Sequence, residues 1–323
     1  MITLSQIIDY LSGRALDPLP VFLMQKEIYK AKAEGAAYSD AYEKMRQTKH
    51  YVELAGEQLV DGSWGRLHSQ DSKAPRKKFV TTEAALRRAG ELGLPKDDPI
   101  ISKCIGLMER YMNGEAAWTD TVEKHRDGGR GHIYCRPFMT AALINMFDPD
   151  NETKKPFQES AANTLEAAFV GGRFDAGFFE REVREYRAPS IISPCNMYGL
   201  MLLQNSPYLS DSLQRRWLGH LWNANGGVYY VSGVPPADLQ KFEGKKFNQW
   251  LYLSELLCGF SAFGEFAGER VIPHLLSETE RLLNGGVYIS HIKEGRYSDS
   301  WRDKEKRKAD MALRIARLLV KCG

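Results

Sequence analysis

Apolar residues recur along most of the chain at the three- and four-residue spacing of an amphipathic helix. This pattern predicts helices in pairs, each with a first helix, a glycine-containing loop and a second helix. The first helices are expected over residues 3–12, 40–58, 97–112, 153–168, 208–223 and 268–283. The second helices are expected over residues 19–34, 80–93, 137–147, 191–204, 247–262 and 303–321. The chain is therefore predicted to be all-α, with six helix pairs.

The two helices of a pair differ in polarity. Second helices are apolar on all sides, as over 138–144 (FMTAALI) and 197–203 (MYGLMLL), whereas the first helix over 211–218 (DSLQRRWL) carries charge. A helix that is apolar all round is buried, and one with a polar face meets solvent. Six alternating pairs then predict an inner ring of helices inside an outer ring. This is a single (α/α)6 toroid domain over residues 1–323, and an open solenoid of helical hairpins is the alternative.

A glycine signature marks the loops between the paired helices, as expected of a repeat architecture. Its copies lie at residues 61–65 (DGSWG), 127–131 (DGGRG), 171–174 (GGRF), 225–229 (NGGVY) and 284–288 (NGGVY). Glycine supplies the positive φ with which a chain leaves a helix sharply. The long loops all follow the first helix of a pair, so they are expected on one face of the toroid.

Composition limits the class of protein. Hydrophobic residues make up 43% of the chain and charged residues 26%, as in ordinary globular proteins. The balance of 44 basic and 41 acidic residues argues against a nucleic-acid partner. No signal peptide and no integral membrane span are expected from the apolar pattern, which leaves peripheral membrane contact open. Five cysteines without CxxC spacing indicate reduced, buried thiols and a cytoplasmic protein.

One loop carries a more specific motif. Gln58, Gly62 and Trp64 read Q-x3-G-x-W, which resembles the QW repeat of squalene–hopene and oxidosqualene cyclases. The later Gly-Gly-Val-Tyr loops resemble degenerate copies of it, and also the loops of protein prenyltransferase β-subunits. The resemblance extends over about residues 40–321 and implies a toroid of the terpenoid cyclase and protein prenyltransferase superfamily. It also implies a structural role for the three residues, with Trp64 stacked on a neighbouring helix end and Gln58 bonded to backbone there.

The chain departs from the catalytic motifs of that superfamily. It has neither the DxDD of the protonating cyclases nor the DDxxD that binds Mg²⁺ in other terpene synthases. Asn248 stands where the late histidine of the prenyltransferase zinc site is expected, and no matching cysteine precedes it. A catalytic zinc needs three protein ligands. No cofactor and no metal are therefore expected, and Mg²⁺ would enter only together with a bound diphosphate.

Ligand contacts are expected where the long loops meet the inner helices, because helix N-termini and arginines favour an anion. The predicted ligand-binding residues are His132, Tyr134, Arg136, Arg173, Tyr198, Asn248, Trp250 and Tyr252. The same loops hold further basic and aromatic residues, among them Arg66, His68, Tyr229 and Tyr230. An aromatic pocket with basic groups suits a prenyl diphosphate, an acidic glycan or a peptide carboxylate. The alternative is that most of these arginines pair with loop acids.

Three carboxylates are candidates for catalysis. Asp175 and Glu180 lie in an acidic and aromatic loop, where contact with aromatic surface can raise a carboxyl pKa. Glu255 falls within an apolar inner helix, where a carboxylate is either paired or functional. His132, Tyr134 and Arg136 form an H-x-Y-x-R cluster that is similar to the Tyr, His and Arg sets of polysaccharide lyases on this fold.

Three functions follow from this sequence. The first is an atypical isoprenoid-active enzyme, a cyclase or transferase of the lyase or isomerase type, that binds a prenyl (di)phosphate in an aromatic-lined cavity. The second is a carbohydrate-active (α/α)6 lyase or glycoside hydrolase acting on an acidic glycan. The third is a non-catalytic binding protein that kept the toroid. The expected partner is a small hydrophobic or anionic ligand, with no nucleic acid and no obligate partner chain.

Overall fold

The computed structural model describes residues 2–33, 35–68, 78–118, 130–182, 195–242, 244–285, 297–300 and 302–322. For residues 130–134, 170, 179–180, 182 and 245 it describes the backbone alone. Helices are the main regular structure in these ranges, and the two strands have two residues each. The all-α prediction is therefore confirmed.

The chain divides into two compact units, which are described in turn. The first unit combines the two ends of the chain, Met1–Glu53 and Asp238–Gly323, and the second is the continuous segment Leu54–Ala237.

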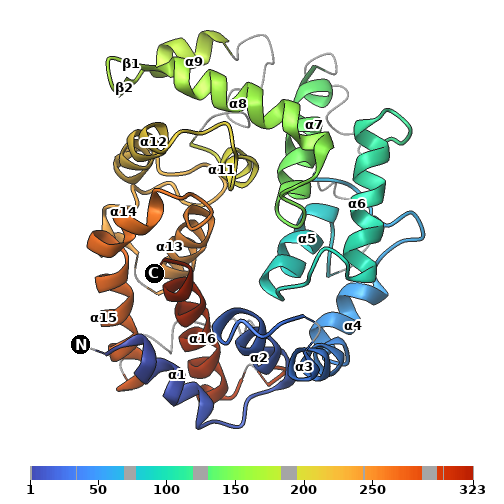
Figure 1. Ribbon diagram of the computed structural model, residues 1–323, viewed down its shortest axis with the longest axis vertical. Coiled ribbons are helices and arrows are strands. Elements are labelled where there is room, and N and C mark those ends of the chain that lie inside the picture. The colour runs from blue at the N-terminus through green and yellow to red at the C-terminus, as the bar shows by residue number, and fades with distance from the viewer. Residues whose placement is uncertain are drawn as a thin grey trace. The chain divides into compact units, whose positions relative to one another are not determined.

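The first unit is built around the C-terminal helix. Its elements are α1 (Leu4–Ser12), α2 (Pro18–Leu23), the π-helix η1 (Met24–Ile28), α3 (Ala36–Arg46), α4 (Lys49–Gly56, whose end belongs to the second unit), the 3-10 turn η5 (Leu239–Lys241), α13 (Lys245–Leu257), α14 (Phe263–Arg270), α15 (Ile272–Leu283) and α16 (Lys304–Cys322). Helix α16 packs against α1, η1, α13, α14 and α15 (Figure 1). It buries polar residues, Asp310, Arg314 and Arg317, as well as an apolar face. These charges need partners inside the unit, and they have them.

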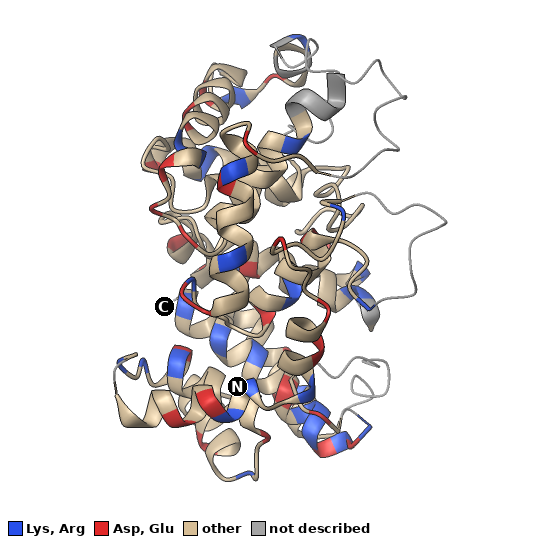
Figure 2. Ribbon diagram, turned by 90° about the vertical axis from the view of Figure 1, so that its right-hand side faces the viewer, with Lys and Arg blue, Asp and Glu red and all other residues tan. Residues whose placement is uncertain are grey.

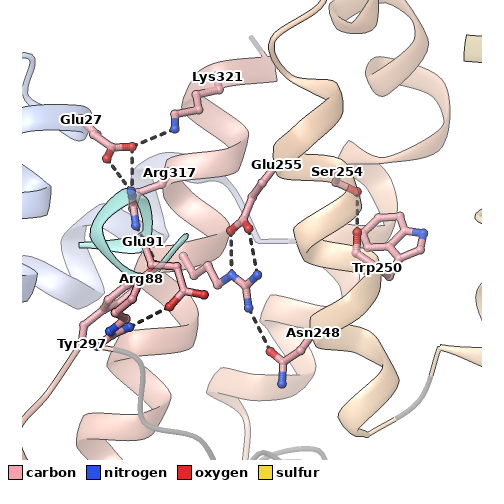
Figure 3. Close-up of polar contacts among 11 residues, drawn as sticks. Glu27, Arg88, Glu91, Asn248, Trp250, Ser254, Glu255, Tyr297, Arg317 and Lys321 are labelled. Carbon is pink, nitrogen blue, oxygen red and sulfur yellow. Dashed lines mark hydrogen bonds and ion pairs between the residues drawn. The ribbon is translucent and has the colours of Figure 1, made fainter. Parts of the chain in front are cut away.

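Figure 3 shows the polar partners of α16. Arg317 donates from Nε to Glu27 at 3.0 Å and from Nη1 to the Tyr297 hydroxyl at 2.7 Å. Lys321 lies 3.1 Å from the same Glu27 carboxylate. These two cations outweigh the effect of burial and lower the pKa of Glu27 to about 2. The network fixes α16 against η1 through charges that are mutually compensated.

The second unit contains the remaining elements. They are α5 (Thr82–Glu91), α6 (Pro99–Met112), α7 (Arg130–Asn145), the 3-10 turn η3 (Glu152–Lys154), α8 (Lys155–Ala168), β1 (Phe169–Val170), β2 (Arg173–Phe174), α9 (Ala176–Glu182), α11 (Met197–Leu203) and α12 (Asp211–Asn223). Helix α11 packs against α7 and α8, and all of its residues are buried. Its apolar sequence is thus explained by burial on every side.

Local sequence accounts for many of the helix starts. Pro99, Pro156 and Pro273 lie in the first turns of α6, α8 and α15. Proline is tolerated there because an N–H in the first turn has no hydrogen-bond partner within the helix. The Thr81 hydroxyl accepts a hydrogen bond from the Ala84 N–H at 3.2 Å and caps α5. Ser210 caps α12 in the same way. Of residues 171–174, expected to be a loop, 171–172 form the turn and 173–174 the second strand of an antiparallel hairpin in which Phe169 pairs with Phe174.

The Q-x3-G-x-W motif joins the end of α4 to the start of α6. The Gln58 side chain donates to the carbonyl oxygens of Gly62 at 2.9 Å and of Ile100 at 2.7 Å. The buried Trp64 indole donates to the Leu54 carbonyl at 2.8 Å, so it is anchored on the helix that precedes the motif. Gly62 has a φ of 101°, and a Cβ there would lie 2.6 Å from the Lys103 carbonyl oxygen. Glycine is therefore required at this crossing.

A histidine, glutamate and tyrosine cluster as the candidate active site

Four polar side chains from separate segments meet in the second unit. Glu83 is in the first turn of α5, and Tyr198 is in the first turn of α11. His68 lies in the segment before α5, and Tyr230 lies in the glycine loop after α12. The His68 ring is within 6 Å of both tyrosine rings, at 5.9 Å from Tyr198 and 5.6 Å from Tyr230 between centroids. They form one cluster around the imidazole.

Backbone hydrogen bonds hold His68 beside Glu83. The Thr82 N–H donates to the Arg66 carbonyl at 2.7 Å, and the Glu83 N–H donates to the Leu67 carbonyl at 3.0 Å. These bonds use two N–H groups of the first turn of α5, which have no partner inside the helix. The segment that ends at His68 is therefore fixed to the helix that carries Glu83.

A similar arrangement fixes Tyr230 near α11. The Tyr229 N–H donates to the Cys195 carbonyl at 2.8 Å, and the Met197 N–H donates to the Tyr229 carbonyl at 3.1 Å. Tyr230 has a φ of 66°, which is rare for a non-glycine residue. Gly227 makes the tight turn sterically accessible, because a Cβ there would lie 2.1 Å from the Ser232 carbonyl oxygen. The loop signature at 225–229 thus builds the turn that presents Tyr230.

Hydrogen bonding assigns the proton on the His68 ring. Nδ1 of His68 lies 2.6 Å from Oε2 of Glu83. A carboxylate accepts hydrogen bonds, so this contact favours the tautomer with the proton on Nδ1 and the lone pair on Nε2. The Tyr230 hydroxyl lies 3.5 Å from this Nε2. A carboxylate that orients a histidine in this way fixes its tautomer, with the lone pair on the far nitrogen as the proton acceptor.

Tyr198 closes the buried side of the cluster. Its side chain is fully buried, and its hydroxyl oxygen lies 2.9 Å from Nδ1 of His68. Burial raises the pKa of Tyr198 well above its usual value, and the charge of Glu83 and a hydrogen bond to that carboxylate raise it further. Tyr198 therefore stays protonated and donates to Glu83. Arg87 lies 3.8 Å from the other carboxylate oxygen.

The opposite side of the cluster is open to solvent. The Tyr229 and Tyr230 side chains are 50% and 42% exposed, and their ring centroids lie 4.3 Å apart. The His68 side chain is 23% exposed. A substrate that rests on the two tyrosines can thus reach a proton acceptor, Nε2 of His68, and a proton donor, the Tyr230 hydroxyl. This is the arrangement required for general acid and base catalysis.

The carboxylates selected from sequence have other environments. Asp175 is exposed, and its Oδ1 accepts a hydrogen bond from the Phe178 N–H at 2.9 Å. Glu255 accepts from Nε and Nη2 of Arg314 at 2.7 and 2.9 Å, and Arg314 also donates to Asn248 at 3.0 Å (Figure 3). Glu255 and Asn248 are therefore brought together as partners of one arginine. The side chain of Glu180 lies outside the described residues.

The predicted ligand-binding residues are divided between the two units. Trp250 is fully buried and stacks on Phe247, with ring centroids 5.9 Å apart, while Tyr252 on the same helix is half-buried. In the second unit, Arg136 is buried in α7 and Arg173 is exposed in β2. The side chains of His132 and Tyr134 lie outside the described residues. Of this set, Tyr198 is the residue that joins the His68 cluster.

Sequence reasoning missed the partnership of His68, Glu83 and Tyr230. His68 and Tyr230 were expected on loops near a ligand, but their partnership with Glu83 was not predicted. Backbone bonds fix the segment of His68 to the start of α5 and the loop of Tyr230 to the start of α11. Pairing between segments so far apart in sequence is encoded by no local pattern.

Metal and membrane features were also examined in the part of the chain that the structure describes. No group of three or more His, Cys, Asp and Glu residues there could hold a metal ion. None of the helices in these ranges combines the length and the apolar character needed to cross a bilayer. Basic and acidic residues are intermixed over the described part of the ribbon (Figure 2), and the formal net charge of the chain is +3.

In comparisons with known proteins, no family model, no curated protein and no solved structure matches this chain.

Proposed function

We propose that this protein is a proton-transfer enzyme centred on His68, and that its reaction is elimination from an anionic glycan. One observation supports this proposal above all. Glu83 lies 2.6 Å from Nδ1 of His68, and the Tyr230 hydroxyl lies 3.5 Å from Nε2 of the same ring. A base oriented by a carboxylate, with a hydroxyl donor beside it at the surface, is suited to moving a proton from one substrate atom to another.

The reaction follows from the two accessible groups. Nε2 of His68 removes the proton from the carbon next to a uronate carboxylate. The bond between the neighbouring carbon and its bridging oxygen then breaks, and the leaving oxygen takes the proton of the Tyr230 hydroxyl. A carbon–carbon double bond remains in the sugar. The proton on His68 returns to the Tyr230 phenolate across the short gap between them, which restores both groups.

Neighbouring residues fit such a substrate. Tyr229 and Tyr230 offer exposed rings with a polar tip, which can cover the apolar face of a sugar while their hydroxyls bond its edge. The Arg87 side chain is 37% exposed beside Glu83 and supplies a cation at the edge of the cluster. A guanidinium recognises a carboxylate through paired hydrogen bonds.

The scaffold we propose is the (α/α)6 toroid of the terpenoid cyclase and protein prenyltransferase superfamily. The bonds from Gln58 to Gly62 and Ile100 support it, because they join one helix pair to the next as a repeat motif should. The alternation of the fully buried helix α11 with the half-exposed helix α12 supports it as well. Repeats of this kind are stabilised chiefly by contacts with their neighbours.

Isoprenoid chemistry is the second candidate, and the same Gln58 junction favours it. In that reaction His68 would act as the base that removes a proton from a carbocation, and the faces of Tyr229 and Tyr230 would stabilise the positive charge. Mg²⁺ would be needed only to bind a diphosphate. The two candidates share the base and differ in the substrate.

A panel of probes separates these functions. The protein is incubated with polygalacturonate, alginate and hyaluronate, and separately with farnesyl and geranylgeranyl diphosphate and Mg²⁺. Unsaturated oligosaccharides are detected by ultraviolet absorbance and mass, and hydrocarbons by gas chromatography. His68→Asn tests the base, and His220→Asn serves as its control because His220 packs on Phe174 at a ring distance of 4.5 Å, away from the cluster.

Each outcome has a definite meaning. Unsaturated oligosaccharides from the wild type and His220→Asn, but not from His68→Asn, would support elimination. A new hydrocarbon that His68→Asn fails to make would support the isoprenoid reaction instead. Binding of a probe without turnover, measured by native mass spectrometry, would favour the non-catalytic binding protein. Turnover that is unchanged in His68→Asn would overturn the proposed site.

A further inference from the structure

Two cysteines lie next to each other in the first unit, whereas the cluster around His68 belongs to the second unit. Cys258 directly follows α13, and Cys322 is the last residue of α16, 64 positions later. Their sulfur atoms lie 3.2 Å apart. Both are thiols in this structure. The S–S bond of a disulfide is about 2.05 Å long, so the two sulfurs must approach by about 1 Å to form it.

The helices hold this pair in place. The bidentate bond between Glu255 and Arg314 joins α13 to α16 one turn before Cys258. The Cys258 N–H donates to the Ser254 carbonyl at 3.1 Å, so the end of α13 stays regular. Gly264 leaves room beside Cys322, since a Cβ there would lie 3.4 Å from the Cys322 carbonyl oxygen. The two sulfurs are thus set by packing and by a salt bridge.

We propose that Cys258 and Cys322 are a redox-active dithiol that hydroperoxides convert to a disulfide. One thiolate attacks a peroxide oxygen, the O–O bond breaks, and a sulfenic acid and one water form from hydrogen peroxide. The second thiol then attacks that sulfur, the S–O bond breaks, and a second water leaves. The two sulfurs lose two electrons together, and the peroxide gains them.

The two sulfurs share a hydrogen bond, which shifts their pKa values in opposite directions. The hydrogen bond with Cys258 and the charge of Lys321 lower the pKa of Cys322. The same hydrogen bond, together with burial, raises the pKa of Cys258, and Glu255 adds to that effect. A thiolate is the nucleophile in such reactions. Either sulfur of the pair can attack, and the other then resolves the sulfenic acid, because one hydrogen bond joins them and either sulfur could donate it.

Thiol counting provides the test. The folded protein is treated with hydrogen peroxide, quenched with catalase, denatured and titrated for thiols. The wild type is expected to fall from five thiols to three, because the sequence has five cysteines and the pair uses two. In Cys258→Ser and Cys322→Ser no disulfide can form, so at most one of the four thiols should be lost, as a sulfenic acid on the remaining cysteine of the pair. The control Cys195→Ser, which leaves the pair intact, should fall from four to two, and peptide mapping should find the bond between 258 and 322.

A thermal measurement adds a second criterion. A crosslink between these positions restricts the unfolded chain, so Tm should rise by about 3–8 °C on oxidation and return with dithiothreitol. The two serine variants should show no rise. Retention of five thiols at full peroxide exposure would overturn the proposal. A disulfide that maps to other cysteines would overturn it as well, as would a sulfenic acid on one cysteine of the pair that persists beside its unreacted partner.

Discussion

Tyr230 gives the simplest test of the proposed reaction. Its proposed catalytic role lies in the hydroxyl alone, and one substitution removes that group. Tyr230→Phe removes that hydroxyl and keeps the ring, so kcat should fall by about 10²–10⁴-fold, as for loss of a general acid. KM should change little, since the aromatic surface is kept. The measurement is steady-state turnover of the glycan or prenyl probe found in the panel.

The neighbouring tyrosine is the matched control. Tyr229 is about equally exposed, but no hydrogen bond from its hydroxyl to His68 is seen. Tyr229→Phe should therefore keep kcat within about threefold and act on KM alone. Equal losses of kcat in the two variants would contradict the role of Tyr230.

Glu27 should control acid stability. Its carboxylate is buried beside Arg317 and Lys321, and its folded pKa of about 2 lies below the unfolded value of 4.5. The stabilisation is therefore present above pH 4.5 and is lost as the pH falls toward 2, a contribution of about 3 kcal/mol. Denaturant unfolding should give the wild type a larger free energy of unfolding than Glu27→Gln at neutral pH. This difference should shrink as the pH falls from 4.5 to about 2.

The exposed Asp40–Lys44 pair provides the comparison for Glu27. Asp40→Asn should leave the free energy of unfolding unchanged at each pH, because exposed pairs are screened by solvent. A gap for Glu27→Gln that stays constant from pH 7 to pH 2 would mean that the ion pair does not contribute through ionisation.

For single residues, the sequence predicts the kind of environment a side chain needs better than it predicts the partner residue that supplies it. A carboxylate within an apolar helix was expected to be either paired or functional, and Glu255 proves to be bound by Arg314. Nothing near Glu255 in sequence indicates that partner, which lies 59 positions away. The His68 cluster was missed for the same reason, because its members lie on two helices and two loops that are distant in sequence.

Two glycines of one loop give a matched test at the scale of elements. Gly62 and Gly65 share a φ of 101°, but only Gly62 has a close neighbour, the Lys103 backbone of α6. Gly65→Ala should cost about 1–2 kcal/mol from strain alone. Gly62→Ala should cost about 2 kcal/mol more, because the helix must also move away. Urea unfolding measures both, and equal losses would contradict the close crossing of the loop and α6.

Helix prediction succeeded where caps and prolines reinforced the apolar period and failed where the chain interrupts it. The expected helix 40–58 is broken between α3 and α4, where the Thr48 hydroxyl bonds the Met45 carbonyl and accepts from the Tyr51 N–H. The expected helix 19–34 ends early in the π-helix η1. The segment 247–262 stops at Leu257, and α14 starts at Phe263. Apolar spacing continues through each break and therefore hides it.

Cooperativity of unfolding tests the organisation of the whole molecule. The single domain over residues 1–323 stays a prediction, and contacts cluster into two compact units. A closed toroid should unfold in one transition, since each repeat depends on its neighbours. Calorimetry should give one peak whose calorimetric and van't Hoff enthalpies agree. Two separate peaks would contradict the single domain and assign each unit its own stability.

The proposed activity depends above all on the protonation of the His68 ring: Nε2 must be unprotonated while Nδ1 bonds to Glu83. ¹⁵N NMR of the histidine rings at neutral pH measures this property without any substrate, and His68→Asn assigns the signals. We expect a protonated Nδ1 and an unprotonated Nε2 in the wild type, and loss of that preference in Glu83→Gln. A ring that carries its proton on Nε2, or a tautomer unchanged by Glu83→Gln, would contradict the base role of His68.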